Sequence, residues 1–148
     1  MSKTVAIASD HGGFALKQVL AEFLRAQGHK VLDLGTGSAE VSVDYPDYAA
    51  KMAVLFREQK PDYGVLLCGT GIGISIAANR FPELRCALCH DATTARLARQ
   101  HNDANILALG GRVVGTEVAK DCLNIFLDTA FEGGRHAARV TKLRDMTS

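Results

Sequence analysis

The chain has 148 residues and a formal net charge of +1 at pH 7, and 47% of its residues are hydrophobic. This length predicts one domain, residues 1–148, that is large enough for a core of its own. The balanced charge argues against nucleic-acid binding, and no apolar stretch has the length of a membrane span. Because the N-terminal residues lack a signal-peptide pattern, we expect a cytoplasmic protein whose four cysteines are reduced.

Short apolar runs alternate with segments of helical periodicity along the chain. Strands are predicted at residues 4–9, 30–34, 63–67, 86–89 and 106–109. Helices are predicted at 16–24, from Pro46 to about 56, at 74–79, at 92–100 and at 118–127, and a short one in the basic tail beyond Glu132. This alternation predicts an α/β fold of the Rossmann or flavodoxin-like type, a three-layer αβα sandwich around a five-stranded parallel sheet.

Polar residues that carry chemistry follow the first and third predicted strands. In parallel sheets, ligands bind beyond the carboxyl ends of the strands, at the point where the strand order reverses. A flavodoxin-like order makes these two strands neighbours, so we expect Asp10, His11 and Cys68 to share one crevice. His101 precedes the fifth strand and falls at the opposite end of the sheet. If His101 is catalytic, a second subunit must deliver it, which predicts a dimer with a shared pocket.

The segment around Cys68 is the most informative stretch of the sequence. A buried strand ends at this cysteine, and glycines at 69, 71 and 73 lead into a helix. Free N–H groups and the positive end of a helix dipole favour the thiolate form of a cysteine. The glycines let the backbone approach an oxyanion or a phosphate closely. This combination indicates a base or nucleophile beside an anion hole, whereas a merely buried cysteine needs no such loop.

Several other patterns have a simpler interpretation. The Cys86–Cys89–His90 spacing matches a haem-attachment motif, but the stretch reads as a buried strand, and no further zinc ligands are grouped near it. The glycine loop matches neither a dinucleotide-binding fingerprint nor a P-loop. Arg135 and Arg139 are either a solvated basic tail or, one helical turn apart, a pair that grips a phosphate. We expect no cofactor and no metal.

Six motifs together carry a resemblance that runs almost end to end. They are Ser9-Asp10-His11-Gly12, Asp44-Tyr45-Pro46-Asp47-Tyr48, the Cys68 loop through Asn79, Arg99-Gln100-His101-Asn102-Asp103, Gly111-Arg112-Val113-Val114-Gly115 and Glu132-Gly-Gly-Arg135-His136. With these motifs in this order, the chain resembles the B-type ribose-5-phosphate isomerases, a family that also contains galactose- and allose-6-phosphate isomerases. The resemblance implies interconversion of ribose 5-phosphate and ribulose 5-phosphate through an enediolate, a step of the pentose phosphate pathway.

The resemblance also implies roles for individual residues. Cys68 is the base, oriented by Thr70, and His101 with Asp10 opens the sugar ring. Ser75 stands where one branch of the family has a catalytic glutamate instead, which favours the thiol mechanism. The implied substrate-binding residues are Asp10, His11, Tyr45, Gly69, Thr70, Gly71, Ile72, Gly73, Asn102, Arg112, Arg135 and Arg139.

Members of this family are homodimers or homotetramers with sites shared between subunits, and their ligand is a phosphorylated sugar. Two alternatives stay open at this point. One is a galactose- or allose-6-phosphate isomerase, and the other is a non-catalytic module that binds a phosphate or nucleotide.

Overall fold

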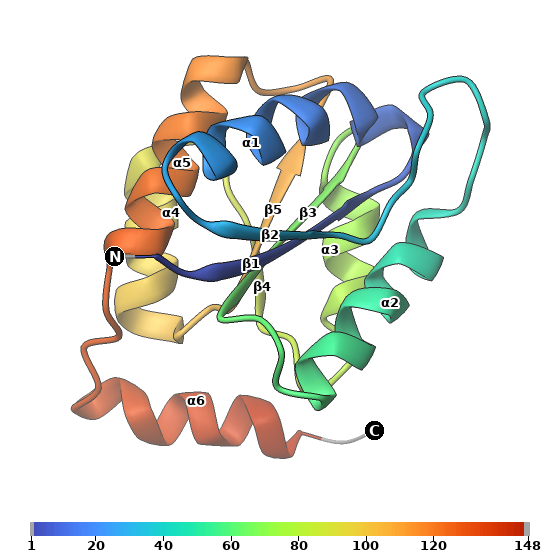
Figure 1. The fold of residues 1–148 in the computed structure, drawn as a ribbon. Coiled ribbons are helices and arrows are strands. Elements are labelled where there is room, and N and C mark those ends of the chain that lie inside the picture. The colour runs from blue at the N-terminus through green and yellow to red at the C-terminus, as the bar shows by residue number, and fades with distance from the viewer. Residues whose placement is uncertain (1, 147–148) are drawn as a thin grey trace.

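A computed structural model of the chain describes residues 2–146, and it contains one five-stranded sheet (Figure 1). The strands are β1 (Thr4–Ser9), β2 (Lys30–Asp33), β3 (Tyr63–Cys68), β4 (Cys86–Leu88) and β5 (Ile106–Gly110). They are all parallel and lie in the order β2-β1-β3-β5-β4. This order confirms the flavodoxin-like prediction, and the strand order reverses between β1 and β3.

Helices cover both faces of the sheet, as a parallel sheet requires. The helical elements of the chain are the short 3₁₀ turn η1 (His11–Gly13), α1 (Phe14–Ala26), α2 (Tyr45–Arg57), α3 (Ile72–Ala78), α4 (Ala92–Asn102), α5 (Thr116–Asp128) and α6 (Arg135–Asp145). Helices α1, α4 and α5 pack on one face, and α2 and α3 pack on the other (Figure 1). The predicted three-layer sandwich is therefore confirmed.

Each face of the sheet has its own hydrophobic core. Val65 and Leu67 of β3 point into the core under α1, α4 and α5, whereas Leu66 and Cys68 point into the core under α2 and α3. The last five residues of β3 are buried, which explains why its sequence is a continuous apolar run rather than an alternating one.

The helix ends differ from the prediction at two places that matter for the site. Helix α3 begins at Ile72, two residues earlier than predicted, and α4 continues through His101 and Asn102. Asp103 ends α4 in the left-handed conformation, with φ of 46°, a position where glycine is the usual signal.

Helix α6 lies across the end of the molecule where the strands begin, and it covers neither face of the sheet (Figure 1). It packs on α4 and is longer than the short helix predicted for the tail, with 11 residues. Within residues 2–146, none of the helices combines the length and the apolar character needed to cross a membrane.

Candidate active site

Cys68 ends β3, and its sulfur lies inside the turn that starts α3. The N–H group of Gly71 donates to Cys68 Sγ at 3.1 Å, and the N–H of Ile72 donates to Thr70 Oγ1 at 3.1 Å. Gly71 has φ of +78°, a conformation that L side chains rarely adopt, and this residue turns the chain from the strand into the helix. The hydrogen bond from Gly71 holds the Cys68 sulfur inside this turn.

The loops after β1, β3 and β5 contact one another through their backbones. The N–H of Gly111 donates to the Cys68 carbonyl oxygen at 2.9 Å, and the N–H of Arg112 donates to that of Gly69 at 2.9 Å. A Cβ atom on Gly12 would lie 3.1 Å from the Gly69 nitrogen. Glycines at these positions let the three loops form one compact platform at the carboxyl ends of the strands.

Asp10 and His11 lie on this platform and are held by backbone groups. The Asp10 carboxylate is buried and accepts the N–H of Gly13 at 3.1 Å. His11 Nδ1 accepts the N–H of Val43 at 3.2 Å, so the neutral ring carries its proton on Nε2. The loop before α2, which had no predicted role, thus fixes the orientation of His11.

Tyr45 and Arg112 lie against the same glycine loop. A Cβ atom on Gly73 would meet the Tyr45 ring at 2.6 Å, and one on Gly69 would meet the Arg112 guanidinium at 3.1 Å. The structure therefore brings together Asp10, His11, Tyr45, Cys68, the loop 69–73 and Arg112, which we name the strand-end group.

The remaining predicted residues lie at the opposite end of the sheet, as expected for His101. His101 and Asn102 form the last turn of α4, which leads into the first residue of β5, and Arg135 and Arg139 lie on α6. Figure 1 shows α6 on the far side of the molecule from the point where β5 ends. We name His101, Asn102, Arg135 and Arg139 the strand-start group. Within one chain, the two groups do not meet.

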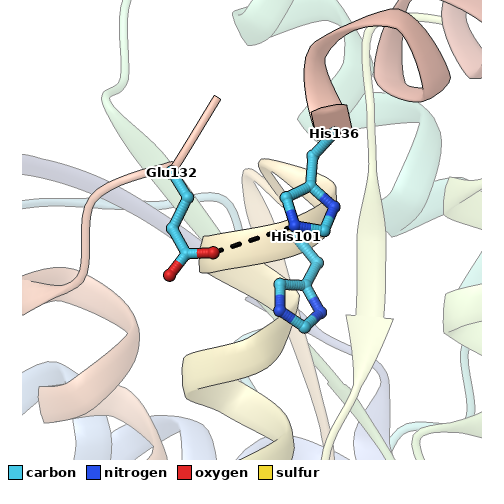
Figure 2. Close-up of side chains that lie close together, drawn as sticks. All are labelled: His101, Glu132 and His136. Atoms are coloured by element: carbon cyan, nitrogen blue, oxygen red, sulfur yellow. Dashed lines mark ion pairs between the residues drawn. The ribbon is translucent and has the colours of Figure 1, made fainter. Parts of the chain in front are cut away.

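His136 contacts His101, and Glu132 lies next to His136; neither residue was among the predicted site residues. The imidazole rings of His101 and His136 are stacked, with centroids 4.4 Å apart and planes inclined by 14°, and Glu132 Oε1 lies 3.8 Å from His136 Nε2 (Figure 2). Burial lowers the pKa of His136 below its usual value, and the positive charge of Arg135 acts in the same direction. His136 is therefore favoured in its neutral form.

The two cysteines of the haem-like motif face opposite sides of the sheet. Cys86 packs against the core under α2 and α3, whereas Cys89 is buried in the core on the opposite face. Burial raises the pKa of both thiols. These cysteines are core residues, as the sequence indicated.

The comparison with known proteins gives the family. Residues 5–143 match the Ribose/Galactose Isomerase family. The chain belongs to this family. It is therefore an isomerase.

Its relatives cover nearly the whole chain. It is 47% identical to ribose-5-phosphate isomerase B of Escherichia coli over 138 residues, 93% of this chain and 92% of that protein. It is 39% identical to D-erythrulose-4-phosphate isomerase of Pectobacterium atrosepticum over 140 residues, 95% of this chain and 92% of the relative. A crystal structure of a ribose 5-phosphate isomerase from Thermotoga maritima superposes with a TM-score of 0.95 at 50% identity, covering 97% of this chain and 99% of that one.

Proposed function

We propose that this isomerase interconverts ribose 5-phosphate and ribulose 5-phosphate, a reaction of the pentose phosphate pathway. The observation that carries the proposal is the environment of Cys68, a thiol with a backbone N–H donor at 3.1 Å from its sulfur, in a glycine loop at the carboxyl ends of the strands. The high identity to a relative named ribose-5-phosphate isomerase B supports the choice of substrate.

In the proposed reaction, the Cys68 thiolate takes the proton from C2 of the open-chain aldose. The bonding electrons move into a C1–C2 double bond, and the carbonyl oxygen becomes the enediolate oxygen. The thiol then returns the proton to C1, while a proton moves from the C2 hydroxyl to O1, and this gives the ketose. A positioned base of this kind contributes about 10²–10⁴-fold to the rate.

The loop 69–73 is proposed to stabilise the enediolate oxygen through its N–H groups, with Thr70 orienting the base. One such donor is typically worth about 2.7–4 kcal/mol in the transition state. Because these dipoles polarise the carbonyl, the scheme requires no metal and no cofactor.

The strand-start group is proposed to reach this platform from a second copy of the chain. His101 of that copy, with Asp10, moves the proton of the ring hemiacetal and opens the sugar. Arg135 and Arg139 of that copy bind the phosphate together with His11, while Asn102, Tyr45 and Arg112 contact the sugar. The phosphate contacts supply binding energy that holds C1 and C2 at the base. We propose a homodimer or homotetramer for this reason.

The test is conversion of ribose 5-phosphate by the purified chain without added metal, with allose 6-phosphate and galactose 6-phosphate in parallel assays. We expect the pentose phosphate to be the preferred substrate and Cys68→Ser to lower turnover at least about 10²-fold, with substrate binding retained. Cys86→Ser is the matched control, because it makes the same change on β4, outside the loop. Turnover of Cys68→Ser near that of the control contradicts the proposed base, and preference for a hexose phosphate contradicts the proposed substrate.

A further inference from the structure

His101, Glu132 and His136 form a compact cluster of metal-ligating side chains (Figure 2). One ligand atom from each side chain, an imidazole nitrogen or a carboxylate oxygen, lies within 4.8 Å of those of the other two. Among residues 2–146, this is the one group of three or more histidine, cysteine or acidic side chains at such a spacing. The proposed isomerisation uses His101 and leaves the other two without a role.

The backbone holds the three residues in place before any ligand binds. The N–H of Glu132 donates to the Gln100 carbonyl oxygen at 3.1 Å, which ties the segment before α6 to the last turn of α4. The N–H of His136 donates to the carbonyl oxygen of Gly133 at 3.0 Å and closes the first turn of α6. The cluster is thus formed where the end of α4 meets the start of α6.

Two imidazoles and one carboxylate are a ligand set that zinc uses when a fourth position is left for water or substrate. Around a tetrahedral zinc ion with Zn–N bonds near 2.05 Å, neighbouring ligand atoms are about 3.3 Å apart. The present separations of up to 4.8 Å can close by rotation of side chains, since Glu132 is exposed and His101 is only partly buried.

The charges around the cluster limit how tightly an ion binds. The positive charges of Arg135 and Arg139 act on His136 and oppose a cation, while Glu132 favours it. Imidazole ligands select zinc, cobalt, nickel and copper over magnesium and calcium. These features fit a reversibly bound transition metal ion better than a resident structural ion.

We propose that His101, Glu132 and His136 bind a Zn²⁺ ion, and that the bound ion inhibits the enzyme by withdrawing His101 from ring opening. The binding half of this proposal stands on the cluster alone. The inhibition half rests on the proposed function, in which His101 opens the sugar ring. Since metal and substrate then compete for His101, each is expected to weaken binding of the other by the same factor.

The binding test is a titration of the full chain with Zn²⁺ by calorimetry and with Co²⁺ by visible absorbance. We expect one ion per chain and no sulfur-to-cobalt charge-transfer band. Glu132→Gln and His136→Gln should each weaken binding at least about tenfold, because even an outer-shell partner of a metal ligand is worth about 10–100-fold. Glu132 is exposed, so Glu132→Gln has little effect on folding.

Two control variants separate this site from other metal-binding groups. His90→Gln removes an exposed imidazole outside the cluster, and Cys68→Ser removes the thiol of the proposed base. Both should keep the wild-type affinity. Binding that survives Glu132→Gln and His136→Gln, or that disappears with Cys68→Ser, overturns the site.

The activity test compares Zn²⁺ inhibition of the wild type with that of Glu132→Gln. We expect a chelator to restore the activity of the zinc-inhibited wild type. Glu132→Gln should keep the activity that it has without metal, and the zinc concentration that halves this activity should be at least about tenfold higher than for the wild type. Equal inhibition of both proteins contradicts the proposed mechanism of inhibition. Absence of any isomerase activity contradicts the proposed function instead, and the binding titration still decides the metal site.

Discussion

At the residue scale, the four cysteines differ in what surrounds their sulfur atoms. A backbone N–H lies 3.1 Å from the sulfur of Cys68, at the end of a strand that leads into the glycine loop. Burial raises the pKa of Cys122 to about 11, and it also raises the pKa of Cys86 and Cys89. These three thiols hold little thiolate near neutral pH.

This difference predicts the outcome of thiol alkylation in the native protein. At pH 8, a thiol with a pKa of about 11 is about 0.1% thiolate, and the thiolate is the reactive form. We expect iodoacetamide to modify one cysteine, identified by peptide mass spectrometry as Cys68, and the Cys68→Ser variant to remain unmodified over the same time. Modification of Cys122 at a rate equal to that of Cys68 would contradict the assignment.

The proposed role of His101 predicts a difference between two kinds of substrate. Replacement by alanine removes the group that moves the hemiacetal proton, so ring opening slows while C–H proton transfer by Cys68 continues. We expect His101→Ala to lower kcat/KM for the cyclic sugar phosphate by about 10²–10⁴-fold, and kcat/KM for an open-chain analogue by much less. The measurement is kcat/KM on both substrates. Equal losses on the two would remove His101 from ring opening.

At the element scale, the turn between β3 and α3 depends on Gly71. A Cβ atom at this position would lie 2.8 Å from the Leu109 carbonyl carbon and 2.7 Å from the Leu88 side chain, and φ is +78°. Gly28, after α1, also has a positive φ, +89°, but a Cβ there would meet nothing within 4 Å. Replacing Gly28 by alanine therefore tests backbone strain alone, whereas replacing Gly71 by alanine tests backbone strain together with a steric clash.

We expect Gly28→Ala to lower the free energy of unfolding by about 1–2 kcal/mol, from the left-handed conformation alone. Gly71→Ala should lose more stability, because it adds a clash with the backbone of β5, and it should also lower activity by displacing the N–H next to Cys68 Sγ. Chemical denaturation and steady-state kinetics check both. Similar stability of the two variants, with full activity in Gly71→Ala, would contradict this account of the turn.

The strands and helices, and the placement of Asp10 and Cys68 at one edge of the sheet, could be predicted because they depend on local sequence patterns. Apolar runs marked each strand to within one residue, and parallel strands bring their carboxyl ends to one edge, so Asp10 and Cys68 could be placed together. The end of α4 was missed because Asp103 takes the left-handed position without being a glycine. Glu132 and His136 could not be placed beside His101, since that contact depends on how α6 docks on α4.

At the scale of the whole molecule, the fold separates the strand-end group from the strand-start group. No rearrangement of side chains brings His101 to Cys68 in one chain, because they lie at opposite ends of the sheet. Ile72 and Ile76 of α3 are one turn apart, beside the platform, and are 51% and 61% exposed. An apolar surface in this place is suited to contact with a second copy, which agrees with the proposed shared site.

Complementation between two inactive variants tests the shared site most directly. Cys68→Ser and His101→Ala are mixed, dissociated and reassembled, and ribose 5-phosphate isomerisation is measured in the mixture and in each variant alone. If each site uses Cys68 of one copy and His101 of another, a mixed dimer contains one intact site. Since random mixing yields half mixed dimers, recovery to about a quarter of wild-type activity is predicted. Activity that stays at the level of the separate variants would contradict the account. If each site were formed within one chain, every site in the mixture would lack either Cys68 or His101.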